Sequence, residues 1–145
     1  MSKLRILTVP DPVLSKKSTE VDDTKDPFIQ GLISNMQETL KQAKGIGLAA
    51  PQVGVNKRVI IVKLWHHEYV LINPRLTYKS REKEVSEEGC LSLPGVYFKI
   101  ERSKKVRVKA QDPEGKKVKI KAKGLLARAL QHEIDHLEGI LIKER

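Results

Sequence analysis

The spacing of apolar residues predicts a helix near the start of the chain. Asp26 followed by Pro27 is typical of an N-cap residue and the first helical position. Apolar side chains then recur three and four positions apart until Gly45, at Phe28, Leu32, Ile33, Met36, Leu40 and Ala43. We therefore expect an amphipathic helix over residues 26–44, with its apolar stripe packed on the core.

Two short β-branched stretches predict an antiparallel pair of strands. Residues 58–64 and 68–73 flank Trp65, His66 and His67, an arrangement typical of two strands and their turn. Neighbouring side chains of a strand or tight turn diverge, so His66 and His67 are poorly arranged to share a metal ion. We interpret both histidines as surface residues of the turn.

Basic residues cluster between positions 99 and 123, where two runs of alternating apolar and basic residues predict a half-buried hairpin. The tetrapeptide 112–115 has Pro at its second position and Gly at its fourth, which favours a turn. The apolar positions are Val106, Val108, Ala110, Val118, Ile120 and Ala122, and the basic positions between them include Lys105, Arg107, Lys109, Lys117, Lys119 and Lys121. We interpret the basic side as a solvated face, with a dedicated RNA surface as the alternative.

The last part of the chain predicts a second helix, over residues 125–138. One apolar stripe consists of Leu126, Leu130, Ile134, Leu137 and Leu141. Leu125 and Ala129 fall on a different side, which they share with His132, so we expect this helix to be buried on more than one side. The predicted fold class is α+β, with short antiparallel β-sheets around this central helix, the helix over 26–44 packed outside, and one domain over residues 1–145.

The composition indicates a strongly positive net charge and a cytoplasmic location. Lys and Arg number 28 against 18 acidic residues, a formal net charge of +10 that favours encounter with anionic partners such as ribosomal RNA. No apolar run reaches the roughly 18 residues of a membrane span, and the first ten residues lack the apolar core of a secretory signal. We therefore expect a cytoplasmic protein without membrane contact.

The second helix contains His-Glu-x-x-His, at His132, Glu133 and His136. At about 100° per residue, two histidines four positions apart lie roughly 40° apart on one helix face, so both can reach one metal ion. Glu133 lies beside them and can reach a water molecule on that ion as a general base. The alternative is a coincidental match on an amphipathic helix.

Cys90 is the candidate for a third metal ligand, because catalytic sites normally combine three protein ligands with water. It is the only cysteine of the chain, so it cannot form an internal disulfide. Gly89 beside it allows close approach of another backbone. A buried, unreactive cysteine is the alternative interpretation.

The small and apolar segment over residues 45–54 lacks the lysine and hydroxyl of a phosphate-binding loop. Its glycines would let an extended peptide approach the backbone. Gln52 offers a neutral amide donor that could stabilise an oxyanion. A plain turn between helix and strand remains the alternative.

Three of these segments, in this order, resemble the signature motifs of the peptide deformylase family. They are Gly45-Ile46-Gly47-Leu48-Ala49-Ala50-Pro51-Gln52, Glu88-Gly89-Cys90-Leu91-Ser92 and Gln131-His132-Glu133-Ile134-Asp135-His136. The similarity extends to Pro10-Asp11-Pro12 and Ile72-Asn73-Pro74, and so covers nearly the whole chain. The resemblance implies an enzyme that hydrolyses the N-formyl group from the N-terminal formylmethionine of nascent proteins and releases formate.

The resemblance also implies a role for each residue. Cys90, His132 and His136 would hold one divalent metal ion, Glu133 would be the general base and acid, and metal-bound hydroxide would attack the formyl carbon. Gln52 and the backbone N–H of Leu91 would stabilise the oxyanion. We expect the substrate to lie against Gly45, Ile46, Gly47, Gly89, Leu125 and Ala129, with Ile46 and Gly47 pairing with its backbone like an added strand.

The resemblance favours Fe²⁺ in cells, while Zn²⁺, Ni²⁺ or Co²⁺ could occupy the site in a purified sample. The implied partners are N-formylmethionyl peptides and nascent chains, with transient ribosome association and no DNA. The sequence stops at Arg145, whereas many members of the family continue into a C-terminal helix. Any ribosome contact made by that helix is therefore in doubt here, and the basic hairpin is a hypothetical substitute.

Two other functional classes fit parts of the pattern. A zinc endopeptidase shares His-Glu-x-x-His but would not need Cys90 as a ligand, and it would cleave internal peptide bonds. A binding protein that has lost turnover could keep the fold, because fold does not fix function. The presence of Glu133, Gln52 and all three candidate ligands disfavours the binding protein.

Overall fold

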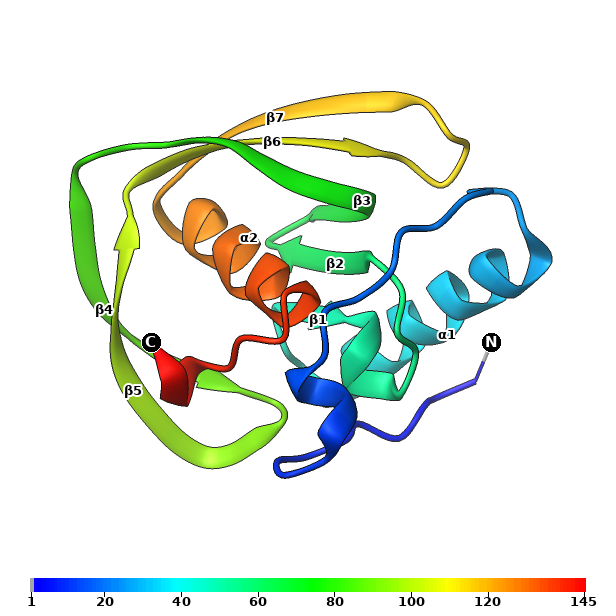
Figure 1. The fold of residues 1–145 in the computed structure, drawn as a ribbon, viewed down its shortest axis with the longest axis horizontal. Helices are drawn as coiled ribbons and strands as arrows, with labels where there is room; N and C mark the ends of the chain where they lie inside the picture. The colour runs from blue at the N-terminus through cyan, green and yellow to red at the C-terminus, as the bar shows by residue number, and fades with distance from the viewer. Residues whose placement is uncertain (1) are drawn as a thin grey trace.

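The computed structural model describes residues 2–145 and has an α+β architecture with antiparallel strands, as predicted (Figure 1). Its helices are α1 (Pro27–Ala43) and α2 (Gly124–Leu137), with three short 3₁₀ turns, η1 (Pro12–Ser15), η2 (Ala50–Val53) and η3 (Ile142–Glu144). Its strands are β1 (Gly47–Ala49), β2 (Val59–Leu64), β3 (His67–Lys79), β4 (Lys83–Cys90), β5 (Leu93–Ser103), β6 (Lys105–Gln111) and β7 (Lys117–Lys123). No helix within residues 2–145 is long and apolar enough to cross a membrane.

The strands form two antiparallel sheets. A five-stranded sheet has the order β1-β2-β3-β6-β7, and β4 pairs with β5 in a separate two-stranded sheet. Helix α2 runs between them, with the five-stranded sheet on one side and the β4–β5 hairpin bending around the other (Figure 1). This arrangement surrounds α2 with protein, in agreement with the prediction that it is buried on more than one side.

Strand β2 is buried on both faces because a different helix covers each of them. Ile60 and Val62 belong to the apolar core with Leu130 of α2. Val59 and Ile61 point the opposite way, into the core with Met36 of α1. A strand covered on both faces reads as a continuous apolar run, which explains the Val-Ile-Ile-Val sequence of β2.

Helix α1 begins as predicted. The side chain of Asp26 accepts a hydrogen bond of 2.8 Å from the backbone N–H of Phe28, and Pro27 is the first helical residue. The predicted stripe is wrong at one position, because Phe28 is 60% exposed and Ile29 is buried in its place. At about 100° per residue, Phe28 lies at the edge of the buried face of the helix, whereas Ile29, in the same turn, points toward its centre.

One predicted strand needs correction, and one hairpin was not predicted. The predicted strand 68–73 continues to Lys79, because the register of β3 shifts between Ile72 and Arg75 and again after Leu76. Pro74 lies at the first shift, where its missing N–H breaks no regular ladder bond. The β4–β5 hairpin was not predicted, because most of the side chains of β4 are exposed and show no apolar alternation.

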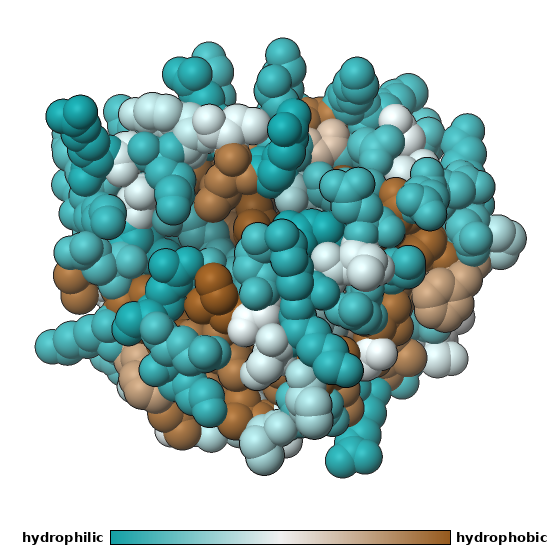
Figure 2. All heavy atoms as spheres, in the orientation of Figure 1, coloured by the Kyte–Doolittle hydropathy of each residue, from teal (hydrophilic) through white to brown (hydrophobic). Residues whose placement is uncertain are grey.

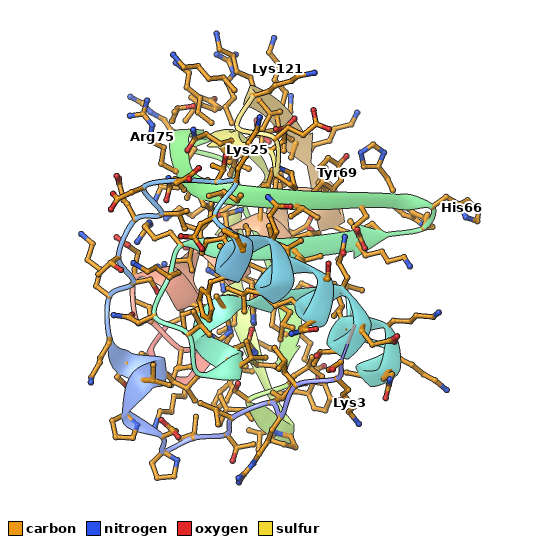
Figure 3. All side chains as sticks on the ribbon, turned by 90° about the vertical axis from the view of Figure 1, so that its right-hand side faces the viewer. Lys3, Lys25, His66, Tyr69, Arg75 and Lys121 are labelled. Atoms are coloured by element: carbon orange, nitrogen blue, oxygen red, sulfur yellow. The ribbon has the colours of Figure 1, made fainter. Side chains whose placement is uncertain are left out.

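The predicted basic hairpin is present as β6 and β7, although residues 99–103 of the predicted basic segment belong to β5. Its turn is closed by a 2.9 Å hydrogen bond from the N–H of Gly115 to the carbonyl of Asp112. His66 and His67 are exposed at the β2–β3 turn, as predicted. The ring of His66 lies at the tip of the β2–β3 hairpin and points away from the body of the protein (Figure 3).

Candidate functional site

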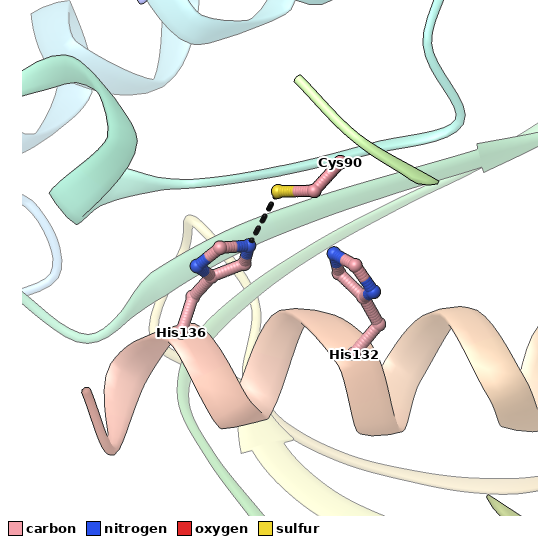
Figure 4. A group of neighbouring side chains, drawn as sticks. All are labelled: Cys90, His132 and His136. Atoms are coloured by element: carbon pink, nitrogen blue, oxygen red, sulfur yellow. Dashed lines mark hydrogen bonds between the residues drawn. The ribbon is translucent and has the colours of Figure 1, made fainter. Parts of the chain in front are cut away.

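Three potential metal-ligating side chains meet beside α2. Cys90 ends strand β4, and His132 and His136 rise from successive turns of α2 toward it (Figure 4). One ligand atom from each residue lies within 4.8 Å of the other two. The Cys90 Sγ atom is 3.2 Å from Nε2 of His136. The structure therefore brings together the three residues that the sequence predicted as ligands.

The donor set fits a divalent transition-metal ion. One thiolate and two imidazoles suit zinc or iron, and three protein donors leave room for a water molecule or substrate. Nearby, the Oε1 atom of Glu133 is buried and has no hydrogen-bond partner among residues 2–145. A buried polar atom without a partner is costly unless a further group satisfies it. Glu133 therefore also indicates that a polar group, such as a water molecule, belongs beside the ligands.

His132 is held in place from behind by a carboxylate. Its Nδ1 atom lies 2.9 Å from Oε1 of Glu88, two residues before Cys90 on β4. Fixing one ring nitrogen leaves Nε2 free to face Cys90 and sets the tautomer that a metal ion needs. Glu88 itself is buried, at 6% exposure, so its charge requires partners.

Two arginines supply those partners. Arg102 of β5 makes two hydrogen bonds of 2.9 Å to Glu88, and Arg128 of α2 makes one of 2.5 Å. Arg102 also reaches Asp135 of α2 at 2.5 Å, and the guanidinium of Arg145 binds the same carboxylate. Each charge of this network is thus paired, and the network ties β4, β5, α2 and the C-terminal segment together around the candidate ligands.

Hydrogen bonds and burial set the protonation of these groups in opposite directions. Burial alone would raise the pKa of Glu88, but hydrogen bonds from Arg102 and His132 lower it to about 2. Burial opposes protonation of His132, yet hydrogen bonds to Cys90 and Glu88 raise its pKa to about 10. Burial, with the neighbouring His132 charge, lowers the pKa of His136 to about 3. The metal-free protein therefore carries one proton more than two neutral imidazoles, and this proton, on His132, is the one that a bound cation would replace.

Glu133 has the protonation behaviour of an acid–base group. It is 4% exposed, and burial raises the pKa of its carboxyl to about 7. A group with a pKa near neutrality can both accept and donate a proton at physiological pH. Gly47 of β1 makes room for it, because an added Cβ there would lie only 2.8 Å from the Glu133 Cδ atom.

The amide of Gln52 is oriented toward the ligands. Its Oε1 atom accepts a 2.9 Å hydrogen bond from the N–H of Ala49, which leaves the amide nitrogen on the opposite side. That nitrogen lies 3.2 Å from Ser92 Oγ and 3.7 Å from Cys90 Sγ. A fixed N–H donor therefore faces the place where the three ligand atoms meet.

A cavity of about 450 Å³ opens over this cluster. All the residues predicted for the site line it except His136, which is buried and contacts Cys90 of the lining. The predicted lining residues are Gly45, Ile46, Gly47, Gln52, Gly89, Cys90, Leu91, Leu125, Ala129, His132 and Glu133. Most of the exposed lining is apolar, and the polar groups in it include Gln52, His132 and Glu133, which is typical of a site for a small ligand or peptide end.

Several residues of the site were not predicted from the sequence. Glu88 and Asp135 lie inside the noticed motifs, and a buried acid beside a ligand is a signal that could have revealed them. Arg102 and Arg128 carried no such signal, because only the fold brings them to Glu88. Tyr97 and Val96 of β5, exposed at the cavity rim, were also missed.

Comparison with known proteins gives a consistent result. The family model described as polypeptide deformylase matches residues 3–145. A peptide deformylase of Natranaerobius thermophilus is 49% identical over 100% of this chain and 93% of its own length. The crystal structure of peptide deformylase from Thermotoga maritima superposes with a TM-score of 0.96 at 41% identity, covering 100% of this chain and 98% of that one. The Ehrlichia chaffeensis enzyme, solved in complex with actinonin, gives 0.93 at 44% identity, covering 97% and 87%.

Proposed function

The chain belongs to the peptide deformylase family, hydrolases that remove the formyl group from N-formylmethionyl peptides, and we propose that it does so at the cluster of Cys90, His132 and His136. The observation that best supports this proposal is that the three candidate ligand atoms all lie within 4.8 Å of one another, next to the buried Glu133. The family is metal-dependent, and this cluster is the candidate site for the ion. We also propose that residues 1–145 form one domain, because both apolar cores share strand β2.

The reaction is hydrolysis of the formyl amide bond. Cys90, His132 and His136 would hold a divalent ion, which would supply Lewis acidity and lower the pKa of a water molecule, so that this water could lose a proton and attack the formyl carbon at neutral pH. The Glu133 carboxylate takes a proton from the attacking water as the new carbon–oxygen bond forms. Glu133 then gives that proton to the departing nitrogen as the carbon–nitrogen bond breaks, which yields formate and a free amine.

Negative charge on the formyl oxygen needs donors as the water attacks. We assign this role to the Gln52 amide nitrogen and the backbone N–H of Leu91. The hydrogen bond from Ala49 that fixes Gln52 supports the assignment, because a donor that is already oriented needs no rearrangement during the reaction. Removal of one such donor typically lowers kcat about 10²- to 10³-fold.

The substrate backbone is proposed to extend the edge of β1. This strand is the first in the order of the five-stranded sheet and pairs only with β2, and Ile46 and Gly47 line the cavity. An extended peptide added along such an edge gains main-chain hydrogen bonds. Leu125 and Ala129 of α2 would contact the methionine side chain, and Gly45 and Gly89 would leave room for the peptide.

For the ion we propose Fe²⁺ in cells, while the same ligands also suit Zn²⁺, Ni²⁺ and Co²⁺. Iron predicts that aerobic purification lowers activity by oxidation of the metal and of Cys90. Equal activity and metal content after aerobic and anaerobic purification would reject iron. We place the activity in the cytoplasm, with transient ribosome association, because nascent formylated chains are the substrate.

The function is tested by release of formate from formyl-Met-Ala by anaerobically purified protein. We expect turnover by the wild type and a roughly 10²- to 10⁴-fold lower kcat for Glu133→Gln, which keeps the side-chain shape but loses the acid–base group. Glu101→Gln, at an exposed position of β5, is the matched control and should retain full activity. Absence of formate release, or cleavage of internal peptide bonds instead, would reject the proposal.

A further inference from the structure

A strongly basic surface lies outside the cavity, on the β6–β7 hairpin. We call it the basic face and define it by Lys105, Arg107 and Lys109 of β6 with Lys119, Lys121 and Lys123 of β7. All six side chains are exposed. Figure 2 shows hydrophilic side chains projecting from the upper edge of the molecule, where Figure 1 places these strands.

The register of the hairpin sets like charges directly opposite one another. Lys105 pairs with Lys123, Arg107 with Lys121, and Lys109 with Lys119. Side chains directly opposite in an antiparallel pair lie about 5 Å apart at Cβ, and like charges there destabilise the sheet. A soluble protein needs surface charge, but it does not need like charges placed directly opposite one another on paired strands. The three consecutive pairs therefore need another explanation.

No acidic side chain within residues 2–145 neutralises the basic face by forming an ion pair with it. The ion pairs nearest to it join Lys104 to Glu82 and Lys116 to Glu114, beyond its two ends. The neighbouring strand β3 adds positive charge instead, because Arg75 pairs with Lys109. Tyr78 is the aromatic neighbour, and the guanidinium of Arg107 lies 5.1 Å from its ring centroid.

The basic face is separated from the proposed catalytic site by the sheet itself. Alternate residues of the same strands, including Val106, Val108 and Ala122, point the other way into the core with α2. On the outer side, α1 packs mainly against β1 and β2 and reaches β3 through the hydrogen bond from Gln37 to Glu68, so it lies over the opposite end of the sheet from β6 and β7. In Figure 3 Lys121 lies at the end of the molecule opposite Lys3.

We propose that the basic face binds the phosphodiester backbone of RNA. Lysines on alternate residues of a strand repeat about every 7 Å, so two parallel rows present evenly spaced positive charge to a linear polyanion. Protein interfaces are enriched in aromatic and apolar anchors and depleted in lysine, which does not describe this surface. A membrane surface is disfavoured as well, because no apolar side chain stands among the six to enter the lipid.

The choice of RNA over other polyanions rests on the proposed function. An enzyme that deformylates nascent chains works beside ribosomal RNA, and a basic face pointing away from the cavity could hold RNA while the cavity stays open. Backbone contacts of this kind give affinity without sequence specificity. Binding to the basic face should therefore depend strongly on salt and weakly on RNA sequence.

The test is fluorescence anisotropy of a labelled single-stranded RNA with the full chain. We expect Lys119→Glu with Lys121→Glu to weaken binding at least about tenfold, and to make the slope of log affinity against log salt shallower by about 1.4, or about 0.7 for each of two lost phosphate contacts. The matched control is Lys3→Glu with Lys16→Glu, which changes the net charge equally at a distant surface. It should bind RNA nearly as well as the wild type.

Two further measurements make the outcome decisive. Lys119→Gln with Lys121→Gln removes charge without reversing it and should weaken binding in the same direction; wild-type affinity in this variant would overturn the proposal. Equal loss in both reversed variants, or tighter binding to vesicles of phosphatidylcholine and phosphatidylglycerol than to RNA, would overturn it too. Formate release from formyl-Met-Ala should be unchanged in all these variants, so failure of the catalytic proposal would appear separately, in the wild type.

Discussion

The Nδ1 atom of His132 lies 2.9 Å from Oε1 of Glu88, and this contact connects the candidate metal cluster to the buried charges of the protein. The same carboxylate also forms ion pairs with Arg102 and Arg128. A change at Glu88 therefore acts on a ligand and on two buried cations at once. This coupling makes Glu88 the position that most directly tests the structural support of the site.

We predict that Glu88→Gln lowers metal affinity by roughly 10- to 100-fold, because loss of a carboxylate behind a ligating histidine has this typical effect. The substitution also leaves Arg102 and Arg128 without their main anionic partner. Removal of one member of a buried ion pair typically costs about 3–5 kcal/mol of unfolding free energy. Competition with a chelator measures the first effect, and urea unfolding of the metal-loaded protein measures the second.

Glu84→Gln is the control for this variant, because Glu84 lies on the same strand with its side chain exposed. It should leave both metal affinity and stability close to those of the wild type. If Glu88→Gln instead bound metal as tightly as Glu84→Gln, the positioning of His132 by Glu88 would be wrong.

Gly47→Ala should inactivate the enzyme without unfolding it. The added Cβ would lie 2.8 Å from Cδ of Glu133, so the carboxylate must move. A displacement of about 1 Å in a reacting group can cost about 100-fold in rate, and we expect kcat for formyl-Met-Ala to fall by about that factor. Steady-state kinetics and a thermal melt on the same preparation separate the two effects.

Gly31→Ala supplies the comparison, because nothing lies within 4 Å of a Cβ added at this exposed position of α1. It should keep full activity and gain up to about 1 kcal/mol of stability, since alanine favours a helix more than glycine does. Normal turnover by Gly47→Ala would show that Glu133 is not confined as the structure indicates.

Metal affinity should rise with pH. Against the effect of burial, hydrogen bonds to Cys90 and Glu88 raise the pKa of His132 to about 10, so the metal-free protein holds a proton there at any lower pH. The ion binds only the deprotonated ring, and displacement of one proton strengthens apparent affinity by about tenfold per pH unit below that pKa. Proton release on adding Zn²⁺ to the metal-free protein in weak buffer gives the stoichiometry; release of no proton would contradict this assignment.

The helices and the candidate ligands could be predicted from the sequence because their signals are local. The Asp26-Pro27 start, the alternation in β6 and β7, and the four-residue spacing of the histidines each depend on a short stretch of chain. Even the α1 stripe was wrong at Phe28, since apolar spacing alone did not show that the buried face is centred closer to Ile29. Local patterns thus predicted which segments form helices and strands better than they predicted which side chains of those segments are buried.

The remaining features depend on parts of the chain that meet only in the fold. Strand β4 presents mostly exposed side chains and gave no apolar pattern, although it ends on Cys90. Arg102 is separated from Asp135 by 33 positions in the chain, and no single-sequence signal pairs them. The extension of β3 past Pro74 needs a register shift that only its partner β6 reveals.

The most direct test of the account is the absorption spectrum of the protein reconstituted with Co²⁺, compared between wild type and Cys90→Ser. If Cys90, His132 and His136 hold the ion, the wild type will show an intense sulfur-to-cobalt charge-transfer band in the near ultraviolet, and Cys90→Ser will lose it. A cobalt spectrum without that band in the wild type, or one unchanged by Cys90→Ser, would contradict the proposed metal site.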